Sequence, residues 1–244
     1  EHSSVARDIF AQAVTALGGV AVLLARSEVF IPVDTEAVDP ETRAQLAGWA
    51  AAHGLDAIIS TDGDGDRPML ADAAGRIVPG DVLGALTARF LGATALVTPV
   101  SSNTQISQMP GFASIMRTKI GSPFVIAAME AALAANPSVA IAGYEANGGF
   151  LLGFAAQGPT GVLAPLMTRD SLLPTLAPLA AARASGQSLA ALVAALPQRF
   201  TAADRLVGVD SARAAVLLSG LLASGAARAD RKSTRLNSSH SKQS

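Results

Sequence analysis

The sequence predicts an α/β fold organised as two similar layered domains. Short apolar runs alternate with stretches of helical periodicity, and glycine or proline stands at most of the junctions. Half of the 244 residues are hydrophobic and 15% are charged, which is enough apolar material for two cores of ordinary size. Twice, a polar glycine-rich loop follows an apolar run, at the position where open α/β sheets usually build their sites.

The first predicted domain opens with a helix and a strand. Phe10, Val14 and Leu17 recur at helical spacing and the pattern stops at Gly18, where a glycine cap is expected. The apolar run 20–24, "VAVLL", then predicts a short buried strand.

A second helix and strand follow with clear boundaries. Asp39, Pro40 and Glu41 are typical of a helix start, because they supply an N-cap, a proline in the first turn and an early acid. Gly54 closes this helix, and "LDAIIS" (55–60) predicts a strand that runs into an acidic loop.

After the acidic loop the sequence predicts two strands and a helix. "PMLAD" (68–72) and "RIVPG" (76–80) are separated by a turn at Gly75. The helix begins at about Asp81, and its apolar face is expected to carry Leu83, Leu86 and Phe90.

The second half repeats this order. "TALVTPV" (94–100) predicts a strand, Ser122 and Pro123 introduce a helix over 124–135, and Asn136 with Pro137 stops it. "SVAIAG" (138–143) predicts a strand that leads into the second polar loop, "YEANGGF".

Composition excludes several classes of function. The net charge of -1 gives no polyanion-binding surface, so nucleic acid is not an expected partner. The absence of cysteine removes disulfides and thiolate chemistry, and no basic-then-apolar leader opens the chain, so we expect a cytoplasmic location. The uncharged stretch 146–168 is interrupted by Asn147, Gln157 and prolines, and no membrane span is expected.

The first loop concentrates carboxylates at alternating positions. Asp62, Asp64 and Asp66 can share one side of a near-extended segment, and the glycines between them let the backbone curl so that their oxygens converge. Carboxylates held this close repel one another unless a cation lies among them, so Mg²⁺ or Ca²⁺ is the expected ligand. An EF-hand is excluded because Arg67 stands where its glycine should be; a solvated acidic turn is the plain alternative.

Arg67 and the second polar loop supply further candidate binding residues. A guanidinium beside a metal site suits a phosphoryl group, although Arg67 could instead only relieve the repulsion between the aspartates. Glu145 and Asn147 occupy the same positions in the second loop as Asp62 and Asp64 in the first. Taken alone, Glu145 is an ordinary loop acid.

Three segments carry a resemblance to a known family. "TDGDGDRP" (61–68), "RTKIGSPFVI" (117–126) and "GYEANGGFLLG" (143–153) resemble the α-D-phosphohexomutases, and the last is similar to their phosphomannomutase-like branch. The resemblance covers most of residues 1–203 and implies α/β/α domains of the phosphohexomutase type around a cleft.

The resemblance implies a role for each site residue. Asp62, Asp64 and Asp66 would hold Mg²⁺ together with a phosphoserine, and Arg67 would contact the phosphoryl group. Lys119 would lie in the cleft near the reacting oxygen, although without the resemblance it reads as a solvated residue at a strand end. Glu145 and Asn147 would hydrogen-bond sugar hydroxyls.

The implied reaction is a phosphate shift between C6 and C1 of a hexose phosphate, with mannose or glucose phosphate as the substrate. Asn147 stands where relatives often have serine, which leaves the hexose preference open.

The resemblance also implies a domain plan. Residues 1–94 would be domain II with the metal loop, 95–203 domain III with the sugar loop, and 204–230 a truncated start of domain IV. Residues 231–244 are rich in Ser, Lys and Arg, resemble a translated cloning adaptor and are expected to be a non-native disordered tail; a native basic tail is the alternative.

No segment like the family's phosphoserine motif or its phosphate loop is found, so domains I and IV of the same protein are expected as missing partners. The chain alone is expected to be an inactive part of a Mg²⁺-dependent mutase. A non-catalytic sugar-phosphate-binding module and a structural metal-binding domain are the alternatives.

Overall fold

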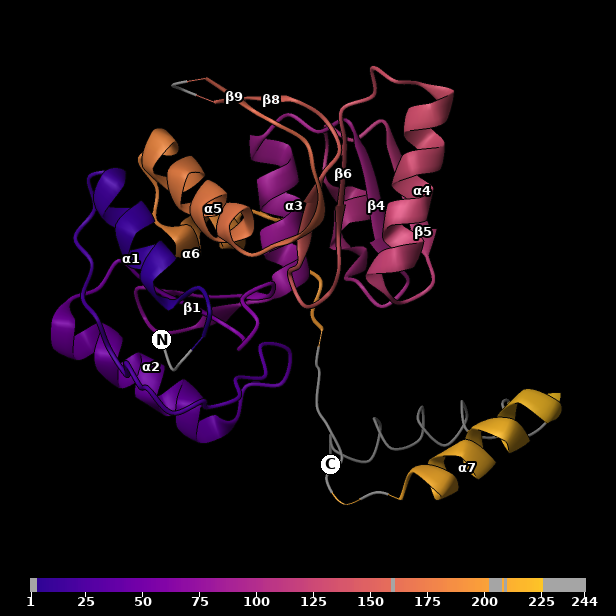
Figure 1. Ribbon diagram of the computed structural model, residues 1–244, viewed down its shortest axis with the longest axis horizontal. Helices are drawn as coiled ribbons and strands as arrows, with labels where there is room; N and C mark the ends of the chain where they lie inside the picture. Colours follow the sequence, from indigo (N-terminus) through magenta and orange to yellow (C-terminus); the bar gives the residue numbers. More distant parts are fainter. Residues whose placement is uncertain (1–3, 159–160, 202–207, 209, 226–244) are drawn as a thin grey trace, which may run out of the picture. The chain divides into compact units, whose positions relative to one another are not determined.

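The computed structural model describes residues 4–158, 161–201, 208 and 210–225. The chain divides into two compact units, residues 1–203 and 204–244. The first unit contains the sheets (Figure 1). By residue number it also contains all the predicted site residues. The described part of the second contains helix α7 (Ser211–Ala223), and the predicted tail over 231–244 lies outside the described residues.

A three-stranded antiparallel sheet carries the first loop. Strand β1 (Ala57–Thr61) pairs with β2 (Pro68–Asp72), and β2 pairs with β3 (Ile77–Val78). The register places Thr61 opposite Pro68, so the acidic loop 62–67 closes the β1–β2 hairpin. Helices α1 (Arg7–Ala16) and α2 (Pro40–His53) both contact β1.

A five-stranded mixed sheet carries the second loop. Its strand order is β10-β7-β6-β4-β5, and β4 (Ala95–Pro99) lies parallel to both β5 (Ser114–Thr118) and β6 (Ile141–Tyr144). Strands β7 (Phe150–Leu152) and β10 (Leu166–Asp170) complete the sheet in antiparallel pairing. A separate ribbon pairs β8 (Ala156–Gly158) with β9 (Gly161–Leu163).

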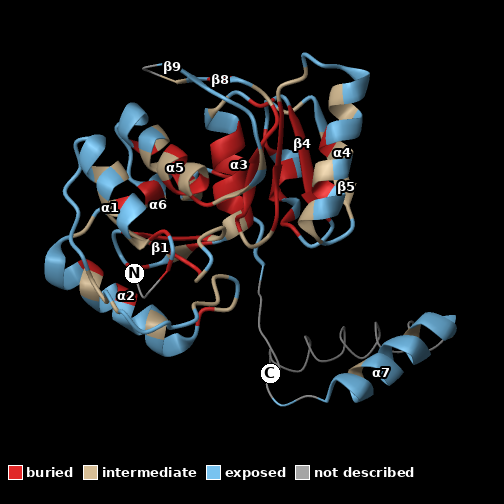
Figure 2. Ribbon diagram, in the orientation of Figure 1, coloured by how far each residue is buried: buried red, intermediate tan, exposed pale blue. Residues whose placement is uncertain are grey.

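Helices cover both faces of the five-stranded sheet. Successive residues of a strand face opposite sides. Accordingly, Leu96 of β4 packs in a core with α3 (Gly80–Phe90), while its neighbours Ala95 and Val97 pack in a second core with α4 (Ser122–Ala135). Helix α5 (Leu172–Ser185) packs against α3, and α6 (Leu189–Ala194) adds to the same core. The buried residues lie along the strands and α3 (Figure 2).

Helix α3 joins the two sheets and positions the second loop. Its core includes Leu70 and Val78 of the three-stranded sheet as well as residues of the five-stranded sheet. Gly84 lets α3 lie against β6, because a Cβ there would be 2.4 Å from Cγ of Tyr144. Tyr144 is the last residue of β6, so this close approach fixes the point at which the second loop begins.

Most of the expected elements are confirmed. Helix α2 starts as predicted, with Asp39 Oδ1 accepting a hydrogen bond from the backbone N–H of Thr42 (2.8 Å), and it ends at Gly54 with φ of 61°. Strand β2 has the predicted bounds, and the turn before β3 has Gly75 at φ of 73°. The α/β class is confirmed as well.

Three details of the prediction are wrong. Residues 20–24 form no strand: they lie outside every described sheet, and Val20 is 91% exposed, because a β-prone run forms a strand only where it has a neighbour to pair with. Phe90 is 45% exposed, since α3 leaves the core at its last residue. Ser122 is the first helical residue of α4, and the N-cap is Gly121.

Within the described residues, no helix combines the length and the apolar character that crossing a bilayer requires.

Candidate functional site

The loop between β1 and β2 is held in a tight bend by its own backbone. The N–H of Asp62 donates to the carbonyl of Arg67 (3.3 Å), and the N–H of Arg67 donates back to Asp62 Oδ1 (3.2 Å). The N–H of Gly65 donates to the carbonyl of Asp62 (3.3 Å), with Gly65 at φ of 77°, a conformation that favours glycine. The bend therefore turns the three aspartates toward one another.

The three aspartates form a cluster of oxygen atoms. One carboxylate oxygen from each of Asp62, Asp64 and Asp66 lies within 4.8 Å of the others. Asp62 is buried, and this burial raises its pKa; the hydrogen bond from Arg67 opposes the rise, and the charges of Asp64 and Asp66 add to it. A cation among the three carboxylates would offset their mutual repulsion.

One carboxylate oxygen of these aspartates has no hydrogen-bond partner among the described residues. Asp66 Oδ1 is buried and accepts no hydrogen bond from the described residues. A buried carboxylate oxygen without a partner is costly unless a ligand satisfies it. Oxygen-only donors suit a hard divalent cation such as Mg²⁺. The residues present therefore fit the expected metal.

Arg67 lies against the cluster. Its Nε is 3.4 Å from Asp62 Oδ2 and 3.8 Å from Asp66 Oδ1, yet it donates no hydrogen bond to the described residues. Arg67 thus offsets the negative charge of the loop and keeps donor capacity for an anionic ligand.

The second loop is closed by similar backbone contacts. The N–H of Glu145 donates to the carbonyl of Gly149 (3.2 Å), and the N–H of Gly148 donates to the carbonyl of Glu145 (3.0 Å). Asn147 Oδ1 accepts the N–H of Gly149 (3.0 Å). Glu145 is buried, and its Oε2 accepts no hydrogen bond from the described residues.

The structure brings the two loops together. Arg169, at the end of β10, forms an ion pair with Asp66 of the first loop, and its Nη1 lies 3.8 Å from Glu145 Oε2 of the second. A Cβ on Gly148 would be 2.7 Å from Cγ of Pro68, the residue at which the first loop ends. The two predicted loops therefore form one polar site.

Lys119 stays outside this contact network. It is exposed, its Nζ lies 5.6 Å from the centre of the Phe124 ring, and it forms no ion pair with either loop in the described part of the chain. It directly follows β5, and Glu145 directly follows β6. The carboxyl ends of these two strands lie on the same side of the sheet, and the strands are separated by β4, which puts them roughly 10 Å apart. Its role in the cleft remains a prediction.

Arg169 and Ser171 were missed by sequence reasoning. The hydroxyl of Ser171 donates to the carbonyl of Gly65 (2.6 Å), so both residues hold the first loop from the end of β10. The available signal was the polar triplet Arg169-Asp170-Ser171 directly before an apolar helical stretch, a pattern typical of a strand end followed by an N-cap.

Glu145 leads to a prediction about pH. Burial raises its pKa, and the charges of Arg169 and Arg67 lower it by less. When folding raises the pKa of a carboxyl, the protonated form stabilises the fold at low pH. This stabilisation is lost as the pH rises from the ordinary Glu pKa through the raised value. Glu145→Gln should therefore have a higher free energy of unfolding than the unchanged chain at pH 7, and the difference should shrink below the usual Glu pKa of about 4.3.

Urea denaturation of both proteins across this pH range measures the difference. Exposed Glu130→Gln on α4 is the matched control and should leave the pH profile unchanged. A difference for Glu145→Gln that widens on acidification would show that the carboxylate is stabilising when ionised, against this account.

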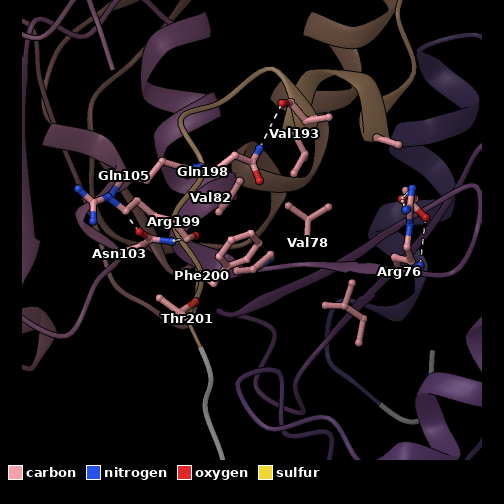
Figure 3. Close-up of a pocket in the computed structure, with 15 residues that line it drawn as sticks. Arg76, Val78, Val82, Asn103, Gln105, Val193, Gln198, Arg199, Phe200 and Thr201 are labelled. Atoms are coloured by element: carbon pink, nitrogen blue, oxygen red, sulfur yellow. Dashed lines mark hydrogen bonds and ion pairs between the residues drawn. The ribbon is translucent and has the colours of Figure 1, made fainter. Parts of the chain in front are cut away.

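A separate cavity of about 390 Å³ lies beside the start of α3 and is bounded by α6 and the segment 198–201 (Figure 3). It contains none of the predicted site residues. Several of the polar side chains on its wall are already bonded: Asn103 Nδ2 donates to the carbonyl of Arg199, Gln105 Nε2 to that of Pro197, and Arg76 pairs with Asp72.

Comparison with known proteins gives consistent matches. The family model described as phosphoglucomutase/phosphomannomutase, alpha/beta/alpha domain III, matches residues 79–200. This span starts ahead of α3, whereas the sequence predicts a domain boundary after residue 94.

A phosphomannomutase from Salmonella muenchen is 48% identical over 206 residues, covering 84% of this chain and 42% of the relative. A phosphomannomutase from Sinorhizobium fredii is 44% identical over 194 residues, covering 80% of this chain and 40% of the relative. The chain therefore spans about two fifths of the length of these relatives.

A solved structure supports the fold. The phosphoglucomutase/phosphomannomutase family protein from Burkholderia thailandensis superposes with a TM-score of 0.59 at 18% identity, covering 81% of this chain and 42% of that chain.

Proposed function

Because the chain belongs to the phosphoglucomutase/phosphomannomutase family, we propose that it is part of a Mg²⁺-dependent phosphohexomutase of the phosphomannomutase type. The proposed reaction moves phosphate between C6 and C1 of a hexose phosphate. The observation that carries the proposal is the single polar site that joins the aspartate cluster, through Arg169, to Glu145.

Each loop has a distinct task in this proposal. Asp62, Asp64 and Asp66 would hold Mg²⁺, which when bound would help to neutralise the charge of a transferring phosphoryl group. The side chain of Arg67 is 37% exposed beside the aspartates, so its guanidinium can also contact a phosphoryl oxygen. Glu145 and Asn147 would bind sugar hydroxyls, and Lys119 would stabilise charge at the reacting oxygen from the same sheet edge.

The phosphoryl carrier is proposed to be a serine outside these 244 residues; the chain covers 42% of the Salmonella muenchen relative. Positioning and electrostatics cannot replace a phosphoryl carrier, so the chain alone should not interconvert mannose 6-phosphate and mannose 1-phosphate. Phosphorus NMR of the purified chain with Mg²⁺ and either phosphate checks this expectation. Conversion by the chain itself would contradict it.

A chimera tests the function itself. Residues 1–203 would replace the matching segment of the Salmonella muenchen phosphomannomutase, which is 48% identical. The folded chimera should convert mannose 6-phosphate to mannose 1-phosphate, and the activity should disappear with a chelator and return with Mg²⁺. A folded chimera that binds Mg²⁺ and yet shows no conversion would favour a non-catalytic binding module.

A further inference from the structure

Arg169 is the one described side chain that forms ion pairs with both loops. Its Nη2 pairs with Asp66 Oδ2, and its Nη1 lies 3.8 Å from Glu145 Oε2. The two acids belong to different sheets, since Asp66 lies in the β1–β2 hairpin and Glu145 follows β6. A forked guanidinium can hold two carboxylates at once in a fixed geometry, which a lysine cannot do.

The surroundings hold Arg169 in place. Its side chain is 27% exposed, and its stem passes over Gly149, where a Cβ would lie 3.0 Å from Cδ of Arg169. Asp170 accepts the N–H groups of Leu172 and Leu173, each at 2.9 Å, and thereby fixes the start of α5. The backbone directly after Arg169 is therefore anchored to the start of α5.

Arg169 pairs with only one of the two carboxylate oxygens of Asp66. Oδ2 pairs with Arg169, while Oδ1 is buried without a hydrogen bond from the described residues. Groups that bond to a ligating carboxylate orient it toward its metal. Here the ion pair with Arg169 holds Oδ2 of Asp66 and leaves Oδ1 for a ligand.

The charges of the site support a link between its two halves. The four carboxylates of Asp62, Asp64, Asp66 and Glu145 face the two guanidinium groups of Arg67 and Arg169, which leaves a formal charge of -2. A divalent cation at the aspartates would match that charge. It would also weaken the pull of Asp66 on Arg169, because both cations compete for the same carboxylate, and would leave Glu145 as the stronger partner of Arg169.

We propose that Arg169 is a positioning residue that couples the metal loop to the sugar loop, so that occupation of the aspartate cluster changes the conformation of Glu145 and its loop. This inference rests on the proposed function, because it assumes a cation at the aspartates. It assigns Arg169 no contact with the reacting atoms.

The test uses the full 244-residue chain and Mg²⁺ alone as the probe. Backbone amide shifts in ¹⁵N-resolved NMR spectra are followed during a Mg²⁺ titration. In the unchanged chain, amides of the metal loop (62–67) and of the sugar loop (Gly148 and Gly149) should both shift. In Arg169→Gln the metal-loop shifts should remain and the sugar-loop shifts should be lost.

Two further variants separate coupling from simple packing. Arg169→Lys keeps the charge but loses the fork, so its sugar-loop response should be reduced, and it serves as the test if Arg169→Gln does not fold. Ser171→Ala removes the second contact that the end of β10 makes with the metal loop and should keep the response at Gly148 and Gly149.

The outcomes are distinguishable. Sugar-loop shifts in Arg169→Gln equal to those of the unchanged chain would overturn the inference and leave the proposed function standing. An unchanged chain in which the metal loop itself fails to respond to Mg²⁺ would contradict the proposed metal site, and the inference with it.

Discussion

Replacing Asp64 by alanine should abolish Mg²⁺ binding by the chain while changing its free energy of unfolding by no more than about 0.5 kcal/mol. Asp64 is exposed, so its loss leaves no cavity and no buried orphan group. It nevertheless supplies one of the three oxygens that lie within 4.8 Å of one another. Removing it leaves two carboxylates that are already paired with Arg67 and Arg169, and with no phosphate ligand present these compete poorly with the waters that Mg²⁺ retains.

Isothermal titration calorimetry with Mg²⁺ measures this effect, and thermal unfolding measures the stability. Asp56→Ala is the matched control, because Asp56 is also exposed and lies just before β1, at the end of the strand away from the metal loop. The control should bind Mg²⁺ like the unchanged chain. A titration of Asp64→Ala that matches the control would place the metal elsewhere.

The second large effect is expected at Gly80, where α3 begins beside the sugar loop. A Cβ at Gly80 would lie 2.4 Å from the backbone nitrogen of Gly148 and 2.5 Å from the carbonyl carbon of Asn147. Backbone atoms cannot rotate out of the way, so Gly80→Ala must displace the sugar loop or the start of α3. Overpacking of this kind costs about 3 kcal/mol, and we expect that loss together with altered amide shifts at 145–149.

Gly48→Ala is the matched control for this prediction and should act in the opposite direction. Gly48 lies inside α2, and a Cβ there would contact nothing within 4 Å. Because alanine is the better helix former, this variant should gain up to about 1 kcal/mol. Urea denaturation compares the two variants. A Gly80→Ala protein as stable as the unchanged chain would show that the close approach to Asn147 and Gly148 does not constrain the site.

Much of the fold could be predicted because local chemistry determines it. Helix α2 is defined by a capping aspartate, a proline and a closing glycine, and each has the same effect in any context. The apolar run 20–24 has the same local character as a true strand, but a strand also requires a neighbour, and that requirement cannot be read from five residues. Strand β7 was missed because it has only three residues, and β10 because it is partly exposed and mixes apolar with polar and charged residues.

The two loops of the site were predicted for a similar reason. Alternating aspartates and glycines favour a cation site through local chemistry alone, and both loops directly follow a strand. Arg169 could not be identified in this way. A single arginine near a strand end is common, and its importance depends on two acids that are distant in the sequence and meet it only after the sheets and α3 have packed together.

Paramagnetic Mn²⁺ can show whether the aspartate loop and the glutamate loop form one site. Mn²⁺ accepts the same oxygen ligands as Mg²⁺ and broadens the NMR signals of nearby amides. With Mn²⁺ bound, the amides of 62–67 and of 145–149 should broaden together, while those of the last turn of α4, around Ala135, stay sharp. Broadening confined to 62–67, with sharp signals at Gly148 and Gly149, would contradict a shared site.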